Sequence, residues 1–285
     1  MHTERFAPSP NGRLHLGHAF SAMLAHDSAR AAGGRFLVRI EDIDRARARP
    51  EHEAAIFEDL AWLGLEWERP VLRQSTRGPA YAEALAVLRA RGLLYPCACT
   101  RRDILAALDA PQEGGPDGPV YPGTCRAHPP DPALPHAWRL DMAAAIEALG
   151  GAQALSRLDF TELDAGPQGE TGPQPLSAAW LIGSCGDVVL ARKDGAAAYH
   201  LAVVVDDAFQ GVTHVTRGRD LFSATPIHRL LQALLGLPTP LYRHHRLIRD
   251  AAGRRLAKRD RDAGIHELRE AGFTPAEIRA RVGLP

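Results

Sequence analysis

Several features are scarce or missing in this sequence, and each absence narrows the possibilities. Formal net charge is zero, because 34 basic residues balance 34 acidic ones, so a nucleic-acid partner would have to bind a local basic patch. No apolar run approaches the length of a membrane span, and the first residues lack the apolar centre of a secretory signal. We therefore expect a cytoplasmic protein with no membrane partner, whose four cysteines form no structural disulfides.

What is present predicts an α/β protein. The 285 residues suffice for one large or two small domains with a substantial core. A short strand at 5–10 ends in prolines, and a helix follows from His15 to about Ala32. A β-rich run at 35–42 and amphipathic helices at 51–67 and 80–92 continue the alternation that is typical of a parallel sheet.

The pattern changes after Tyr95. A Pro- and Gly-rich stretch indicates an irregular inserted module, and short antiparallel strands are expected at 137–142, 158–162 and 187–195. Regular α/β alternation returns over 198–236. A short helix is expected after Thr274-Pro275.

The stretch RFAPSPNGRLHLGH, residues 5–18, places two histidines and a glycine where the first helix begins. Backbone N–H groups and the positive end of the helix dipole converge at such a point and favour anions. Gly17 would let a ligand approach the first turn closely. His15 and His18 could donate hydrogen bonds to phosphoryl oxygens as charge shifts between them, so this motif predicts an ATP site.

Three of the cysteines predict a metal site. Cys97, Cys99 and Cys125 lie in the irregular segment and suit a tetrahedral structural zinc, which would stabilise a region poor in apolar residues. Spacing alone favours His128 as the fourth ligand. Cys185 lies apart and is expected in the core.

The motifs together resemble the class I aminoacyl-tRNA synthetases, specifically the glutamate branch. The matching stretches run in order along nearly the whole chain: RFAPSPNGRLHLGH, RIEDID at 39–44, CAC at 97–99, YHLAVVVDD at 199–207, VTRGRDL at 215–221 and RLAKR at 255–259. The resemblance implies a Rossmann-like catalytic domain in two halves, residues 1–94 and 186–262. An inserted zinc module of acceptor type would occupy residues 95–185, and a short helical segment residues 263–285.

The resemblance also implies roles for particular residues. Arg5 and Arg217 would hold the carboxylates of L-glutamate, Glu41 its ammonium group, and Tyr199 would close the side-chain pocket. ATP, with Mg²⁺, would contact His15, Gly17, His18 and Lys258, of which the two histidines and the lysine would be catalytic. The remaining expected glutamate contacts are Phe6, Ala7, Pro8 and Ser9. For the structural zinc, one per chain, the resemblance favours Tyr121 with the three cysteines, whereas spacing favours His128.

The RLAKR stretch resembles the mobile KMSKS loop of the family. Lys258 matches the central lysine, which stabilises charge on the phosphates, and Arg255 keeps the first positive charge. Ala257 replaces the first serine of the KMSKS motif, and Arg259 replaces its final serine. The hydroxyl contacts of that loop are therefore missing here.

Three departures favour a shorter branch of the family. Val203 stands where the full-length enzymes of the resembling family have asparagine, and Phe20 stands where they have arginine. The sequence also leaves no room for an anticodon-binding domain. The shorter branch activates glutamate without tRNA and transfers it to the cyclopentenediol of queuosine at the wobble position of tRNA(Asp). The sequence does not identify the residues that contact the RNA. The arginines of the basic carboxyl-terminal region could form a local phosphate-binding patch or a solvated surface, namely Arg243, Arg246, Arg249, Arg254 and Arg261.

Three alternatives stay open at this stage. A truncated synthetase could charge a tRNA 3′ end, although Val203 and the missing domain argue against it. A small nucleotidyltransferase also carries HxGH but needs no zinc module or glutamate-binding arginines. An inactive fragment could bind RNA, which Ala257 favours and the retained His15, His18 and Lys258 oppose.

Overall fold

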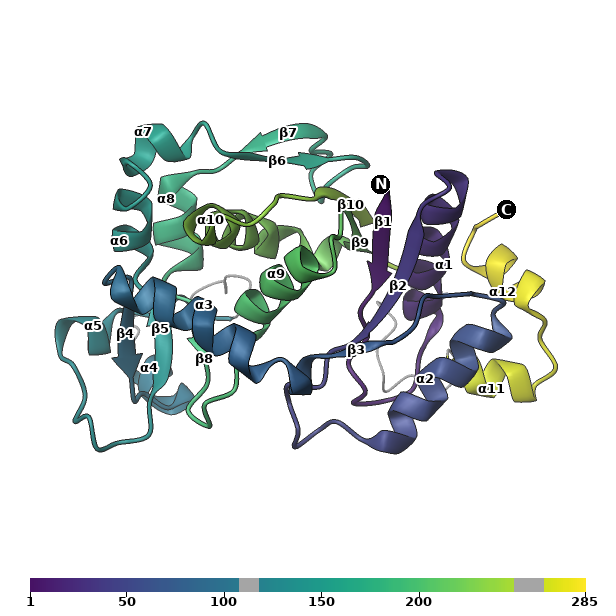
Figure 1. The fold of residues 1–285 in the computed structure, drawn as a ribbon, viewed down its shortest axis with the longest axis horizontal. Coiled ribbons are helices and arrows are strands. Elements are labelled where there is room, and N and C mark those ends of the chain that lie inside the picture. The colour runs from purple at the N-terminus through teal and green to yellow at the C-terminus, as the bar shows by residue number, and fades with distance from the viewer. Residues whose placement is uncertain (108–117, 249–263) are drawn as a thin grey trace.

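The computed structural model describes residues 1–107, 118–248 and 264–285 of the chain, and its strands form three sheets (Figure 1). A parallel sheet contains β1 (Thr3–Phe6), β2 (Arg35–Ile40) and β3 (Leu72–Arg73). A mixed sheet has the order β7 (Gly172–Pro175), β6 (Asp159–Glu162), β10 (Leu241–His245) and β9 (His214–Gly218). The third sheet is antiparallel and contains β4 (Leu94–Cys97), β5 (Ala137–Leu140) and β8 (Val189–Ala191). The predicted α/β class is confirmed.

The first strand and helix position the nucleotide motif. Strand β1 ends at Phe6, earlier than predicted, because the chain then meets Pro8 and Pro10, which have no N–H for a ladder. Helix α1 (Leu16–Ala31) follows as predicted, with buried residues such as Ala19 and Met23 packed in the first core cluster beside β1 and β2. The helix start therefore lies just beyond the carboxyl end of β1.

The parallel and mixed sheets meet through two threonines. The Thr213 N–H donates to the Thr3 carbonyl oxygen at 3.0 Å, and the Thr3 N–H donates to the Thr213 hydroxyl at 2.8 Å. Thr213 directly precedes β9. These two hydrogen bonds thus join the two predicted halves of the catalytic domain, between β1 and the residue before β9.

The longer helices pack around these sheets in two groups (Figure 1). Helix α2 (Pro50–Trp62) packs beside α1, while α3 (Gly78–Ala90), α9 (Tyr199–Phe209) and α10 (Thr225–Leu235) enclose a second apolar cluster. The short α-helical segments are α4 (Arg101–Ala106), α5 (Thr124–Ala127), α6 (Met142–Glu147), α7 (Gly151–Leu155), α8 (Ala178–Trp180), α11 (Ile265–Glu270) and α12 (Pro275–Arg281). Gln74–Thr76 and Arg219–Ala224 form 3₁₀-helices, and Leu181–Cys185 forms a π-helix.

The predicted carboxyl-terminal helix is present as α12. The Thr274 hydroxyl accepts from the Glu277 N–H, and the Glu277 carboxylate accepts from the Thr274 N–H at 2.7 Å, which is a capping box. Buried Ile265, Ile278 and Val282 join the apolar cluster around α1. This segment therefore covers the helix that carries the HLGH motif (Figure 1).

One strand of the predicted inserted module has a second role. The strand expected at 158–162 is β6, which pairs antiparallel with β7 as predicted but also parallel with β10, through Glu162 and Tyr242. Hydrogen bonding thus links this stretch to the second half of the predicted catalytic domain. Within the described ranges, we find no helix that is both long and apolar enough to cross a membrane.

Candidate active site

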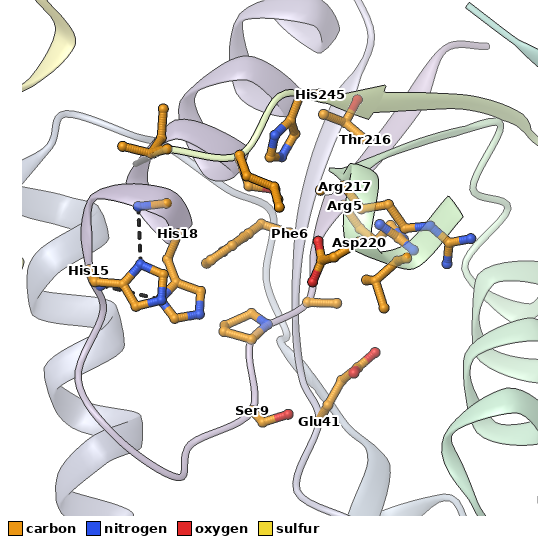
Figure 2. A pocket seen from close by; sticks show the side chains of 18 of the residues that line it. Arg5, Phe6, Ser9, His15, His18, Glu41, Thr216, Arg217, Asp220 and His245 are labelled. Carbon is orange, nitrogen blue, oxygen red and sulfur yellow. Dashed lines mark hydrogen bonds between the residues drawn. The ribbon is translucent and has the colours of Figure 1, made fainter. Parts of the chain in front are cut away.

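A pocket of about 430 Å³ opens where β1, β2, β9 and β10 end and α1 begins (Figure 2). Crevices at the carboxyl ends of parallel strands are the usual ligand sites of α/β folds. Every predicted glutamate or ATP residue in the described ranges lines this pocket: Arg5, Phe6, Ala7, Pro8, Ser9, His15, Gly17, His18, Glu41, Tyr199 and Arg217. The roles of these residues stay predictions, but the fold brings all eleven of them to one pocket.

The two histidines of HLGH cap the first helix with their own rings. The Gly17 N–H donates to His15 Nδ1 at 3.0 Å, and the His15 N–H donates to His18 Nδ1 at 3.2 Å. Because both Nδ1 atoms accept, each neutral ring carries its proton on Nε2. A Cβ on residue 17 would lie 2.9 Å from the His15 ring, so Gly17 accommodates that ring as well as a ligand.

A buried ion network holds Arg5. Its guanidinium donates twice to the Asp207 carboxylate, at 3.0 and 3.3 Å, and Arg39 donates to the same carboxylate at 2.6 Å. Arg39 also donates to Glu41 at 3.1 Å. Arg5 thus enters the pocket already paired with a carboxylate, which fixes its position.

The pKa values of the two acids in this network shift in opposite directions. Burial raises the pKa of Glu41, an effect that Arg39 and Arg5 only partly offset. Burial also acts on Asp207, but there the attraction of Arg5 and Arg39 wins and lowers the pKa of that carboxyl group. A cation placed beside Glu41 would therefore favour its ionised form.

Arg217 has a different environment. It is 5% exposed, and the acceptors around it are neutral. Its guanidinium donates to Thr225 Oγ1 at 2.7 Å, His244 Nε2 at 3.1 Å, His228 Nδ1 at 3.2 Å and the Tyr199 hydroxyl at 3.4 Å. Within the described ranges, no carboxylate forms an ion pair with this guanidinium. A buried cation without a counter-ion is costly, so the site is suited to an anionic ligand.

The two imidazoles beside Arg217 are held neutral. Burial lowers the pKa of His244 to about 4 and that of His228 well below its usual value, and the Arg217 charge adds to both effects. His244 Nδ1 donates to the buried Glu162 carboxylate at 2.5 Å, which leaves Nε2 free to accept from Arg217.

The predicted KMSKS-like residues Arg255, Ala257, Lys258 and Arg259 lie outside the described residues. The chain on either side of them reaches the site. Ile248 lines the pocket, and Gly264 forms a bridge with His15, beside which the Ile265 N–H donates to the Leu14 carbonyl at 3.0 Å.

Three residues that the sequence singled out lie away from the pocket lining. Val203 is 2% exposed inside α9 and packs in the apolar core. Phe20 is also buried, with its ring centroid 4.9 Å from that of His245. Arg246 stacks on Phe20 and donates to the Val282 carbonyl, so it contacts the carboxyl-terminal helix. Arg249, Arg254 and Arg261 lie outside the described residues.

The cysteine cluster forms at the end of β4. The three sulfur atoms of Cys97, Cys99 and Cys125 lie within 4.8 Å of one another. The Tyr121 hydroxyl lies 3.4 Å from Cys97 Sγ and 3.5 Å from Cys99 Sγ, and it accepts from the Cys125 N–H at 2.8 Å. His128 is exposed and is not part of the cluster of possible metal ligands, Cys97, Cys99 and Cys125, found among the described residues. The four cysteines, all within the described residues, form no disulfide with one another, and Cys185 is buried in the core as expected.

Sequence reasoning missed residues that support the site. Asp207 and Arg39 lie inside quoted motifs, but only the fold shows that they pair with Arg5. Thr216 and His245 line the pocket and have buried polar atoms, Oγ1 and Nε2, without a hydrogen-bond partner. Thr216 lies in the motif VTRGRDL, which was a signal that could have identified it. Nothing in the sequence singled out Glu162, the partner of His244.

Comparisons with known proteins agree with this site. Residues 2–129 and 181–284 match the family described as tRNA synthetases class I (E and Q), catalytic domain. A solved glutamate-tRNA synthetase from Elizabethkingia anophelis superposes with a TM-score of 0.77 and 25% identity, over 99% of this chain and 61% of that one. The chain thus spans about three fifths of the length of that structure. A methionyl-tRNA synthetase from Mycobacterium tuberculosis shares the fold at a TM-score of 0.65.

The fold and the site therefore define a class I tRNA synthetase catalytic domain of the glutamate and glutamine type. A curated protein from Rhodobacter capsulatus named glutamyl-Q tRNA(Asp) synthetase is 56% identical over 98% of this chain and 99% of its own length. One of the same name from Symbiobacterium thermophilum is 44% identical over 96% of this chain. The chain belongs to this glutamyl-Q tRNA(Asp) synthetase family.

Proposed function

We propose that this chain activates L-glutamate with ATP, without tRNA, and transfers the glutamyl group to queuosine in tRNA(Asp). The observation that carries the proposal is Arg217, a buried guanidinium surrounded by neutral acceptors. Membership in the family, and the name glutamyl-Q tRNA(Asp) synthetase that its relatives carry, support the same function.

The charges in the pocket suit glutamate. Arg5 and Arg39 form ion pairs with the carboxylates of Asp207 and Glu41, whereas no described carboxylate forms an ion pair with Arg217, so one positive charge is left over among these five groups. This excess is local to Arg217, because the pocket lining also contains the carboxylate of Asp220. Glutamate carries two carboxylates and one ammonium group, and its net charge of about −1 would balance that excess. Its ammonium would sit near Glu41 and its side-chain carboxylate at Arg217, which donates to the hydroxyl of Tyr199, the residue expected to close the side-chain pocket.

The reaction would proceed in two steps. An α-carboxylate oxygen of glutamate attacks the α-phosphorus of ATP, and pyrophosphate leaves. A hydroxyl of the queuosine cyclopentenediol then attacks the glutamyl carbonyl carbon, and AMP leaves. His15 and His18 would stabilise phosphoryl charge through their Nε2–H groups, because their Nδ1 atoms cap the helix. Lys258 is the predicted partner on the other loop, and Mg²⁺ would neutralise charge on the leaving pyrophosphate.

The first expected result is an exchange reaction. The purified chain should exchange labelled pyrophosphate into ATP when glutamate is present and tRNA is absent. Glutamine should support about a hundredth of that rate or less, because it brings no anion to Arg217. Equal rates with the two amino acids, or no exchange with glutamate, would contradict the first step.

The second expected result concerns the acceptor. Labelled glutamate should become attached to tRNA(Asp) that contains queuosine and not to the same tRNA with guanine at the wobble position. Removing the 3′-terminal adenosine should leave the attachment intact, because the acceptor is a base in the anticodon loop. Loss of attachment after this trimming would show that the chain charges the 3′ end instead.

The cysteine cluster would hold a structural zinc. Three thiols and a phenol oxygen form a closed four-ligand set, which suits zinc and leaves no position for a reacting water. Burial raises the pKa of Cys99 to about 11, whereas at Cys125 the hydrogen bonds of Tyr121 and Cys99 outweigh burial and lower the pKa to about 7. Zinc, when bound, would stabilise all three thiolates and join β4 to α5.

We expect about one zinc per chain by elemental analysis. Cys125→Ser should lose the metal and unfold at a lower temperature, because the irregular segment loses its cross-link. His128→Ala is the matched control and should keep both metal and stability. A C125S protein that retains its zinc, or an H128A protein that loses it, would rule out this ligand set.

A further inference from the structure

We infer that Glu162 is a positioning residue that acts through His244 and sets the affinity for the substrate carboxylate at Arg217. The inference rests on the proposed function, since it concerns the same pocket. Glu162 lies on β6 and is 1% exposed, and it does not line the pocket itself.

The connection runs through a chain of hydrogen bonds from β6 to the pocket. Glu162 Oε2 accepts from His244 Nδ1 at 2.5 Å. His244 Nε2 then accepts from Arg217 Nε at 3.1 Å and from the Thr225 hydroxyl, also at 3.1 Å. Thr225 in turn accepts from Arg217 Nη2 at 2.7 Å. The bonds that Glu162 and Arg217 form with His244 both require that the His244 proton be on Nδ1.

The other Glu162 oxygen fixes the orientation of the carboxylate. Oε1 accepts from two backbone N–H groups, that of His244 at 2.9 Å and that of Asp164 at 3.1 Å. A glutamine at this position would have to keep its oxygen there, because its amide nitrogen cannot accept those bonds. Its NH₂ group would then face His244 Nδ1 and force the imidazole proton onto Nε2.

This change in the His244 tautomer would break the hydrogen bond between His244 and Arg217. A His244 Nε2–H would point at the Arg217 Nε–H, so two donors would face each other inside a buried site. The guanidinium would have to move away from this contact. His228 supports the same arrangement from the other side, since its Nδ1 accepts from Arg217 Nη1 while its Nε2 donates to His200 Nδ1 at 3.1 Å.

Glu162→Gln tests this inference in the glutamate-dependent pyrophosphate exchange assay. We expect the KM for glutamate to rise by about tenfold or more, while the KM for ATP and kcat change by less than about threefold. A purely structural defect would instead lower the active fraction and leave both KM values unchanged. Glu147→Gln, an exposed position on α6, is the matched control and should behave as the wild type.

Thr225→Val provides a second variant of nearly equal volume in case E162Q does not fold. It removes the hydroxyl that bridges Arg217 and His244, so the KM for glutamate should again rise selectively. Unchanged glutamate KM values in the folded variants would overturn the inference. A wild-type chain without any glutamate-dependent exchange would instead refute the proposed function, so the two failures can be told apart.

Discussion

The site depends on one constraint, which is the burial of the Arg217 guanidinium without a carboxylate among its described partners. The described groups around it accept its hydrogen bonds but bring no negative charge into contact with it. Arg5 offers the contrast, because Asp207 already neutralises it with two hydrogen bonds. Of the two arginines expected to hold carboxylates, Arg217 is therefore the one that most needs an anion from the substrate.

The rest of the fold serves to hold these charges in place. Strands β1, β2 and β9 carry Arg5, Arg39 and Arg217 respectively, while Asp207 comes from α9. Because these strands and α9 lie side by side, Asp207 can form ion pairs with Arg5 and Arg39, which lie far from it in the sequence (Figure 1). Such a network fixes side-chain geometry more than it stabilises the fold, because burying each charge has a cost.

The sequence predicted the α/β class, and the resemblance of its motifs to the synthetase family singled out eleven residues that line one pocket, although their roles stay predictions. Long-range pairing was not predictable in this way. Nothing local reveals that Glu162 on β6 reaches His244 on β10, because that contact requires the parallel pairing of two strands about 80 residues apart. Val203 was singled out as a lost polar group within a functional motif, and the fold places it in the apolar core, because helical periodicity turns that position of α9 inward.

The central claim is that Arg217 selects for an anionic side chain, and calorimetric binding of glutamate and glutamine to the wild type and to Arg217→Met tests it most directly. A charge-assisted hydrogen bond contributes about 1.5–3 kcal/mol, so the wild type should prefer glutamate by roughly 10- to 100-fold. In R217M, which keeps the bulk but removes the charge, that preference should fall to within about threefold. If R217M still preferred glutamate as strongly as the wild type does, the account would be wrong.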